Sequence, residues 1–466
     1  METVNNRCIG NCSSCGKCKG ANILDEMNNR KTKPSFMPDD FTADEMEKYG
    51  ISFDIGTTTV VGNLWNLKKG ISLQIVAKTN PQNIFGADVI SRINYCEDNP
   101  IKFIKIRDKI IDCLNEIIEE LLIGNQVDKQ NIVKITVVGN TTMSHIFAGF
   151  NPKPLARSPF TPAFTGEKEF KAYELRLNIN PETNVILLPN IAGHVGSDIT
   201  GGVLATRLEK LNGMNLYIDI GTNGEIVLTK DYKTYACSTA AGPAFEGAAI
   251  YQGMRAASGA IESIQIKNGT VFFKTIDKSE PVGICGSGLI EALSEMIKNG
   301  MINKTGRLLL PGEIKGEPLK GDLPLRLRVG PKGREFVLVF KENTEDIVIT
   351  QMDIREVQLA KGAIYAGIKL MLSELHEEIE NIDRVIIAGA FGTYIDKDSG
   401  LTIGILPNIS PDKITFVGNA AGTGSSLVLL SEKERNRANK IVSNIEHLEL
   451  ATCKNFQEEY LKAMSF

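Results

Sequence analysis

Two stretches of the chain carry the same pattern of apolar and polar residues. In residues 51–61, ISFDIGTTTVV, apolar residues alternate with small or polar ones, give way to a glycine turn and then resume. Residues 216–228, LYIDIGTNGEIVL, repeat this order. Alternation with a period of two is typical of β-strands, so each stretch predicts a strand–turn–strand hairpin. The shared D-I-G-T sequence is more than a hairpin turn requires, and it indicates two related halves.

The rest of the pattern predicts an α/β protein. Apolar residues at helical spacing predict long amphipathic helices over 103–122 and 353–375. Short apolar runs predict further buried strands at 132–138, 185–188, 385–388 and 414–417. Turn residues between alternating runs at 306–350 predict a hairpin insertion, and the charged residues 431–466 predict a helical tail.

The same pattern divides the chain into segments. Residues 1–20 are rich in cysteine, glycine and asparagine and lack the apolar periodicity that a packed core needs. Residues 21–49 are polar and charged and predict a linker. We expect the first half of a duplicated domain at 50–210 and the second half at 211–466.

Composition narrows the classes of function. The chain has 466 residues, of which 42% are hydrophobic and 23% charged, as in water-soluble globular proteins. A net charge of −4 argues against a nucleic-acid partner. No apolar run reaches the length of a membrane span, and the N-terminus lacks the apolar region of a secretion signal. We therefore expect a cytoplasmic protein that binds neither nucleic acid nor a membrane.

Each D-I-G-T turn combines groups that bind phosphate and a metal ion. Gly56 and Gly221 leave backbone N–H groups able to face an anion, and threonine hydroxyls add hydrogen-bond donors. Asp54 and Asp219, near the strand ends, are the candidate catalytic residues because they would hold Mg²⁺ against phosphate oxygens. The other phosphate-binding candidates are Thr57, Thr58, Thr222 and Asn223. Glu225, directly after the second turn, is a further candidate residue of the site.

Structural roles are the alternative for several of these polar residues. Each aspartate could be a residue that caps its turn and has no catalytic role. Four others fit a structural role at least as well as a functional one and stay outside the candidate set: Glu246, Ser287, His145 and His194.

Four of the nine cysteines lie within the first 18 residues. Their spacing is Cys8-x3-Cys12-x2-Cys15-x2-Cys18, with glycines between them that let the backbone curl around a ligand. The last three match the C-x2-C-x2-C run of bacterial ferredoxins, which favours a 4Fe-4S cluster. A four-thiolate zinc site is the main alternative, whereas disulfides do not fit a reducing compartment. The other five cysteines predict buried apolar positions.

The order of the polar strand-end motifs resembles a known superfamily. Besides the two D-I-G-T turns, the chain carries GNTT at 139–142, AGAFG at 388–392 and GNAAGTG at 418–424. This order resembles the nucleotide-site motifs of sugar kinases, heat-shock chaperones and actin. The resemblance implies two actin-like (ribonuclease H-like) α/β halves related by a pseudo-twofold axis, with ATP and Mg²⁺ in the cleft. It also implies that Gly389 and Gly392 let adenosine approach the backbone.

Longer strings are similar to one branch of that superfamily, the ATP-dependent reductive activators of corrinoid enzymes. Those strings include NPQNIFGADVISRI, PFTPAF, TAAGPAFEGA, GICGSGLIE and QMDIREVQLAKGAI, and the resemblance covers about residues 50–430. It implies ATP-driven reduction of a corrinoid protein from Co(II) to Co(I). It also implies a low-potential electron donor such as ferredoxin, and a homodimer.

One departure from that branch concerns the front end. The better-known activators begin with a plant-type 2Fe-2S ferredoxin domain followed by a further domain, and residues 1–49 are too short for either. We therefore expect the electron to come from a cluster on the four cysteines.

Three other functions share parts of this pattern. Activators of 2-hydroxyacyl-CoA dehydratases couple the same ATP fold to a 4Fe-4S cluster, but their cluster cysteines lie inside the fold and are shared by two subunits. A small-molecule kinase with a zinc-binding tail is the second. The third is a non-enzymatic ATP-dependent switch, as in the chaperone and actin branches.

Overall fold

Two six-stranded sheets organise the part of the chain that the structure describes. The computed structural model describes residues 37–38, 40–41, 46–231, 233–315, 317–389, 395–453 and 455–466. Both D-I-G-T hairpins form as predicted, and the α/β fold with two related halves is confirmed. No helix within these ranges is both long and apolar enough to cross a membrane.

The first sheet contains the first D-I-G-T hairpin and has the strand order β3-β2-β1-β4-β6-β5. β2 is antiparallel to both of its neighbours, β1 and β3, whereas β1, β4 and β6 are parallel. The strands are β1 (Tyr49–Ile55), β2 (Thr59–Asn66), β3 (Ile71–Thr79), β4 (Ile132–Gly139), β5 (Lys168–Lys171) and β6 (Asn184–Leu187). The helices along this half are α2 (Val89–Cys96), α3 (Pro100–Asn125), α4 (Thr141–Ala148) and α5 (Ser197–Thr206).

The second sheet repeats this arrangement with the order β17-β16-β7-β8-β9-β18. Its strands β9-β8-β7-β16-β17 match β3-β2-β1-β4-β6 of the first sheet in both order and strand direction. The strands are β7 (Asn215–Ile220), β8 (Gly224–Lys230), β9 (Lys233–Thr239), β16 (Arg384–Ala388), β17 (Ile414–Gly418) and β18 (Ile445–His447). The duplication predicted from the two D-I-G-T turns therefore extends over five strands of each sheet, and β5 and β18 have no counterpart.

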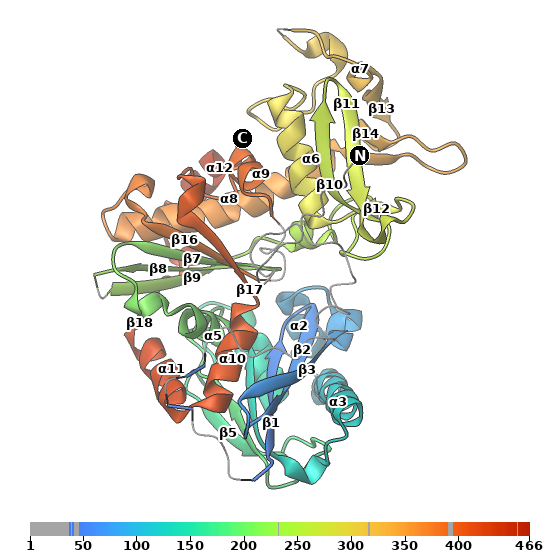
Figure 1. Cartoon of the computed structure of the whole chain (residues 1–466). Helices are drawn as coiled ribbons and strands as arrows, with labels where there is room; N and C mark the ends of the chain where they lie inside the picture. The colour runs from blue at the N-terminus through green and yellow to red at the C-terminus, as the bar shows by residue number, and fades with distance from the viewer. Residues whose placement is uncertain are drawn as a thin grey trace, which may run out of the picture.

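Two helices pack between the sheets. α5 lies against α10 (Ala420–Leu430), and α10 also covers β1 and β4 (Figure 1). Gly201 and Gly424 let these helices approach closely, since a Cβ on Gly424 would lie 2.2 Å from the carbonyl oxygen of Gly201. The second half of the sequence thus contributes a helix that packs on the first sheet.

Strand alternation decides which face of each sheet meets these helices. In β1, Ile51, Phe53 and Ile55 join the core that includes α3, whereas Ser52 Oγ lies 2.8 Å from Ser426 Oγ of α10. In β7, the apolar residues that alternate with Tyr217 likewise belong to one core. Tyr217 belongs to a different core and packs with α5 and α10. Asp54 lies two residues after Ser52, and Asp219 lies two residues after Tyr217, so each aspartate is on the same face of its sheet as that neighbour. Both aspartates therefore belong to the faces turned toward α5 and α10.

The second half also carries an insertion between β9 and β16. It holds the small sheets β11-β10-β12 and β13-β14-β15 and, in Figure 1, projects away from the first half. The predicted hairpin at 306–350 is in fact the three-stranded sheet, entered through a short helix. The elements are β10 (Ala260–Lys267), β11 (Thr270–Thr275), β12 (Gly283–Ile284), α6 (Gly286–Lys298), α7 (Leu323–Arg326), β13 (Leu327–Gly330), β14 (Gly333–Val339) and β15 (Ile347–Thr350).

Both long predicted helices form, and the predicted tail differs in one place. α3 extends beyond the predicted span at both ends, whereas α8 (Gln351–Glu374) begins two residues earlier than predicted and ends one residue earlier. Asp353 and Thr350 cap the start of α8. The tail forms α11 (Glu432–Asn444) and α12 (Phe456–Ala463), after α9 (Lys397–Ile403) earlier in the half. It is not helical throughout, because β18 pairs in parallel with the edge of β9.

Part of the predicted linker packs on the domain. Met37 and Phe41 contact an apolar cluster formed by Trp65, Leu429 and Leu430. Asp40 accepts a hydrogen bond of 2.5 Å from Ser431 Oγ at the start of α11, and this bond lowers the pKa of Asp40. The chain therefore enters the domain at a fixed place, beside β2 and the junction of α10 and α11.

Candidate functional site

The two D-I-G-T turns are held by hydrogen bonds of their own backbone. In the first, the Gly56 N–H donates to the carbonyl oxygen of Thr59 over 3.0 Å, and Asn80 Nδ2 donates to the carbonyl oxygen of Gly56 over 2.8 Å. In the second, the Gly221 N–H donates to the carbonyl oxygen of Asn223 over 2.9 Å. Each turn is thus a fixed loop at the end of its parent strand.

Asp54 and Asp219 occupy equivalent positions in the two sheets. Asp54 lies opposite Val138 in the parallel pair β1–β4, and Asp219 lies opposite Ala388 in β7–β16. A glycine follows each opposite residue in the sequence. The two carboxylates therefore come from the same edge of two related sheets, as the predicted pseudo-twofold arrangement requires.

Each aspartate carboxylate accepts a hydrogen bond from a neighbouring side chain. Asn419, at the start of α10, donates through Nδ2 to Asp54 Oδ2 over 2.9 Å. The Tyr217 hydroxyl donates to Asp219 Oδ2 over 3.2 Å. Asn419 belongs to the GNAAGTG motif and was not among the predicted site residues.

Burial and like charges raise the pKa values of four carboxyl groups in this region. Burial raises the pKa of Asp54 to about 7 and that of Asp219 to about 6. Burial and the neighbouring carboxylates also raise the pKa values of Asp198 and Glu225. Such a cluster of acidic groups favours a bound cation, which would offset both the burial and the repulsion.

The acidic cluster does not form a complete metal cage by itself. Across the described ranges, no three histidine, cysteine, aspartate or glutamate side chains are arranged to hold a metal ion. Mg²⁺ is usually held by one or two carboxylates together with waters and substrate phosphates. The residues present therefore fit a magnesium ion that binds together with a phosphate-bearing ligand.

The predicted phosphate-binding side chains already have partners. Asn140 Nδ2 donates to Thr57 Oγ1 over 2.9 Å, which links the GNTT segment to the first turn. The side chain of Asn223 hydrogen-bonds Glu225. Each contact fixes a predicted phosphate-binding side chain to a partner in its own half of the protein.

One carboxylate joins the two turns. Glu246 Oε2 accepts a hydrogen bond of 2.6 Å from Thr58 Oγ1, and Glu246 Oε1 accepts one of 2.6 Å from Thr222 Oγ1. Thr58 and Thr222 belong to different halves, so Glu246 brings the two turns together. In the sequence, Glu246 fits a capping or packing role at least as well as a catalytic one, and nothing in TAAGPAFEGA indicates a contact 188 residues away.

A buried arginine holds the backbone of the first turn. Arg92 of α2 is fully buried, and its Nη2 donates to the carbonyl oxygen of Thr57 over 2.6 Å. Its Nε donates to the carbonyl oxygen of Gly86 over 3.0 Å. Burial lowers its pKa to about 10, so the guanidinium keeps its charge at neutral pH. Arg92 thus places a positive charge behind the turn.

Comparison with known proteins assigns the chain to a family. Residues 49–211 match a family model described as the RACo middle region, and residues 213–466 match one described as the C-terminal domain of RACo, the ASKHA domain. The chain belongs to the RACo family. The resemblance to the sugar kinase, chaperone and actin superfamily is thereby confirmed at the level of the fold.

The relatives of this RACo-family protein agree with that assignment. It is 39% identical to the corrinoid activation enzyme RamQ of Eubacterium limosum, over 91% of this chain and 72% of the relative. It is 23% identical to the [Co(II) methylated amine-specific corrinoid protein] reductase of Methanosarcina barkeri, over 90% and 77%. A solved structure, the reductive activator for corrinoid, iron–sulfur protein, shares 39% identity and a TM-score of 0.80 over 91% of this chain and 67% of that one.

Family membership decides among the alternatives that the sequence left open. The dehydratase activator, the small-molecule kinase and the non-enzymatic switch all share the fold, but the RACo models match the chain on both sides of residue 212. Both curated relatives are named as enzymes.

Gly389 fits close against one of the acidic residues. Its backbone has φ = +91°, and a Cβ at this position would lie 2.6 Å from Asp219 Oδ1 and from the carbonyl oxygen of Ile220. The absence of a side chain therefore leaves room for the Asp219 carboxylate. Gly392, predicted with it to admit adenosine, lies outside the described residues, as do Cys8, Cys12, Cys15 and Cys18.

Two of the histidines have structural surroundings. His145 is fully buried, its Nδ1 lies 2.7 Å from the carbonyl oxygen of Thr141, and its Nε2 accepts from the Ala163 N–H over 2.9 Å. Its ring stacks on Phe164 at 4.4 Å between centroids. His194 packs edge-on against Phe160. These contacts tie a loop of the first half that is rich in proline, at residues 150–164, to the domain.

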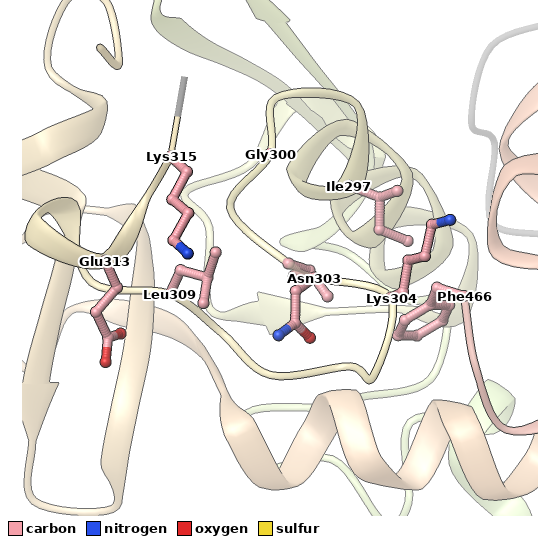
Figure 2. Close-up of a pocket in the computed structure, with 9 residues that line it drawn as sticks. Ile297, Gly300, Asn303, Lys304, Leu309, Glu313, Lys315 and Phe466 are labelled. Carbon is pink, nitrogen blue, oxygen red and sulfur yellow. The ribbon is translucent and has the colours of Figure 1, made fainter. Parts of the chain in front are cut away.

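A surface pocket elsewhere in the second half does not include any predicted site residue. Figure 2 shows this cavity of about 520 Å³ at the end of α6, beside the C-terminal residue Phe466. Its polar lining comprises Asn303, Lys304, Glu313 and Lys315. The acidic cluster and the threonine turns, and not this pocket, form the candidate site.

Proposed function

We propose that this protein couples ATP hydrolysis between its halves to reduction of a corrinoid protein from Co(II) to Co(I). The observation that carries the proposal is membership in the RACo family over nearly the whole described chain. The named relatives act on corrinoid proteins. The equivalent aspartates and the threonine turns joined through Glu246 support a nucleotide site at the junction of the halves.

The residues of this site would divide their roles by chemistry. Asp54 and Asp219 would hold Mg²⁺ between the halves and draw the ATP phosphates toward the turns. Gly56, Gly221 and the hydroxyls of Thr57, Thr58 and Thr222 would bind phosphate oxygens, and Asn223 would hold the second turn in shape. Gly389 and Gly392 would lie beside the nucleotide.

The electron would come from a 4Fe-4S cluster on Cys8, Cys12, Cys15 and Cys18. The domain contact at Met37 limits where this cluster can reach, since 18 residues separate Cys18 from Met37. A fully extended segment of that length spans at most about 65–70 Å. The cluster would therefore serve a corrinoid protein bound near β2 and the α10–α11 junction, or elsewhere within this radius.

ATP is needed because the reduction is uphill for ordinary donors. For a one-electron step, each 59 mV of unfavourable gap costs about 1.4 kcal/mol. A nucleotide can offset this gap only if the bound partner interacts differently with the two nucleotide states. We expect the donor to be a low-potential protein such as ferredoxin, the assembly to be a homodimer, and the location to be a reducing compartment such as the cytoplasm.

The test distinguishes the role of the cluster from the role of ATP hydrolysis. A chain lacking residues 1–20 should bind and hydrolyse ATP like the full chain but fail to reduce a Co(II) corrinoid protein. An Asp219→Ala chain should keep a cluster that dithionite reduces but should hydrolyse no ATP and form no Co(I). If the truncated chain forms Co(I) as fast as the full chain, the cluster is not the route of the electron.

A further inference from the structure

The hydrogen bonds of Glu246 to the two turns are not explained by a role in nucleotide binding. It ends a short 3-10 turn, Pro243–Glu246, and Gly247 follows with φ = +80°. Its two carboxylate oxygens accept hydrogen bonds from the hydroxyls of Thr58 and Thr222. A carboxylate is acceptor-only, and so is a phosphate without a proton. The nucleotide would therefore compete with Glu246 for the same two hydroxyls.

We propose that Glu246 is the general base that activates water for ATP hydrolysis. This inference rests on the proposed function. When phosphate oxygens take the two threonine hydroxyls, both Glu246 oxygens lose their donors while the side chain stays beside the turns. Like charges keep the carboxylate from contacting the phosphate directly, so a water molecule fits between them. The carboxylate orients that water with a hydrogen toward itself and a lone pair toward the terminal phosphorus.

The chemical step balances with groups already named. The water oxygen forms a bond to the terminal phosphorus, and the bond from that phosphorus to the bridging oxygen breaks. ADP leaves with that electron pair, and Glu246 takes the proton that the water loses. Glu246 then returns the proton to solvent, and inorganic phosphate departs.

The surroundings of Glu246 suit this role better than those of the other carboxylates. Asp54 and Asp219 lie at the strand ends, where Asn419 and Tyr217 donate to them. Among the residues that the structure describes, Glu246 instead accepts hydrogen bonds from the Thr58 and Thr222 hydroxyls, which the phosphates would take. The positive charge of Arg92, which holds the first turn, interacts with the Glu246 carboxylate through space.

The same geometry would link hydrolysis to the relative position of the halves. After phosphate leaves, Glu246 can again accept from Thr58 of the first half and from Thr222 of the second. The carboxylate would thus alternate between bridging the turns and holding the water. Because both contacts are lost together when ATP binds, Glu246 would join the two halves only when no ATP is bound.

The deciding variant is Glu246→Gln in the full chain, with Mg-ATP as the probe. Glutamine keeps the size and one acceptor oxygen but cannot take a proton at neutral pH. Hydrolysis should fall by about 100-fold or more, as expected for loss of a general base, while the Mg-ATP affinity measured by calorimetry changes by less than about tenfold. Glu246→Asp should retain more activity than Glu246→Gln, because it still carries a base.

A matched control is Glu291→Gln. Glu291 of α6 also accepts two hydrogen bonds, from Ser263 Oγ over 2.8 Å and from the Ile264 N–H over 2.9 Å, but it lies in the insertion. This variant should hydrolyse ATP at the parental rate, which would show that changing a hydrogen-bonded glutamate elsewhere in the second half does not by itself stop hydrolysis.

Each outcome separates this inference from the proposed function. If the parent hydrolyses ATP and Glu246→Gln does so equally well, the general base is another group. Tighter Mg-ATP binding with unchanged hydrolysis would show that Glu246 only competes for the threonines, and loss of nucleotide binding would make it a positioning residue. Each of these results overturns the inference and leaves the proposed function standing. A parent that neither binds nor hydrolyses ATP overturns both.

Discussion

Replacing Gly389 by alanine tests how tightly the second aspartate is held. The new Cβ would lie 2.6 Å from Asp219 Oδ1 and from the carbonyl oxygen of Ile220, whereas ordinary contacts of a Cβ lie at 3.4–4 Å. The carboxylate or the backbone must therefore move by roughly 0.8 Å, and a displacement near 1 Å at a reacting group can cost about 100-fold in rate. We expect ATP hydrolysis to fall by about 10- to 100-fold.

Backbone strain needs a separate control, because Gly389 has φ = +91°. Gly333 has φ = +97°, and a Cβ there meets nothing within 4 Å. Gly333→Ala should therefore carry a similar backbone cost of about 1–2 kcal/mol without a clash. Comparing the two variants isolates the effect of the contact with Asp219.

The assay combines urea denaturation with a phosphate-release measurement on both variants. Both should lose stability, with the larger loss in Gly389→Ala, and only Gly389→Ala should lose hydrolysis. Equal hydrolysis by the two variants would refute the reasoning, because it would mean that the position of Asp219 does not limit the reaction.

Three further predictions concern the metal site, the cluster and the proline-rich loop. Asp54→Asn and Asp219→Asn should each lower phosphate release by at least about 100-fold, since each removes a charge that holds Mg²⁺, and parental rates would make that aspartate a turn cap. Cys12→Ser and Cys15→Ser should each abolish the broad visible absorption and the bound iron after anaerobic purification, and stoichiometric zinc without iron in the parent would contradict the cluster. Burial lowers the pKa of His145 from the ordinary value of 6.5, so the folded state binds fewer protons than the unfolded state as the pH falls below about 6.5, and its stability decreases there. Denaturation at pH 5.5 and 7.5 should show this loss to be smaller in His145→Gln than in the parent, and equal losses would show that His145 does not carry it.

Local patterns in the sequence were enough to predict the repeated frame. The D-I-G-T hairpins and α3 follow from alternation and helical spacing, which depend on neighbours a few residues apart. β18 could not be predicted in this way, because three residues carry no periodicity and their strand character comes from pairing with β9. The packing of α10 on the first sheet was missed for a related reason, since AAGTGSSLVLL has no single apolar stripe.

The candidate site shows the same division between local and long-range information. The sequence predicted Asp54, Asp219 and the threonines because each belongs to a repeated local motif. Residues that complete the site, such as Asn419 and Glu246, act on partners up to 365 residues away. Asn419 had a usable signal in its strand-end glycine motif, whereas Glu246 became visible only when the turns were brought together.

The most direct test of the account follows the Co(I) absorbance of a corrinoid protein under anaerobic conditions. The full chain is reduced first and mixed with the Co(II) corrinoid protein, and Mg-ATP is added to the same sample afterwards. We predict almost no Co(I) before Mg-ATP and rapid formation after it, with no response when Mg-ADP is added instead. Co(I) that forms equally without nucleotide, or none after Mg-ATP with any corrinoid protein of the methyltransferase type, would contradict ATP-driven reduction by this protein.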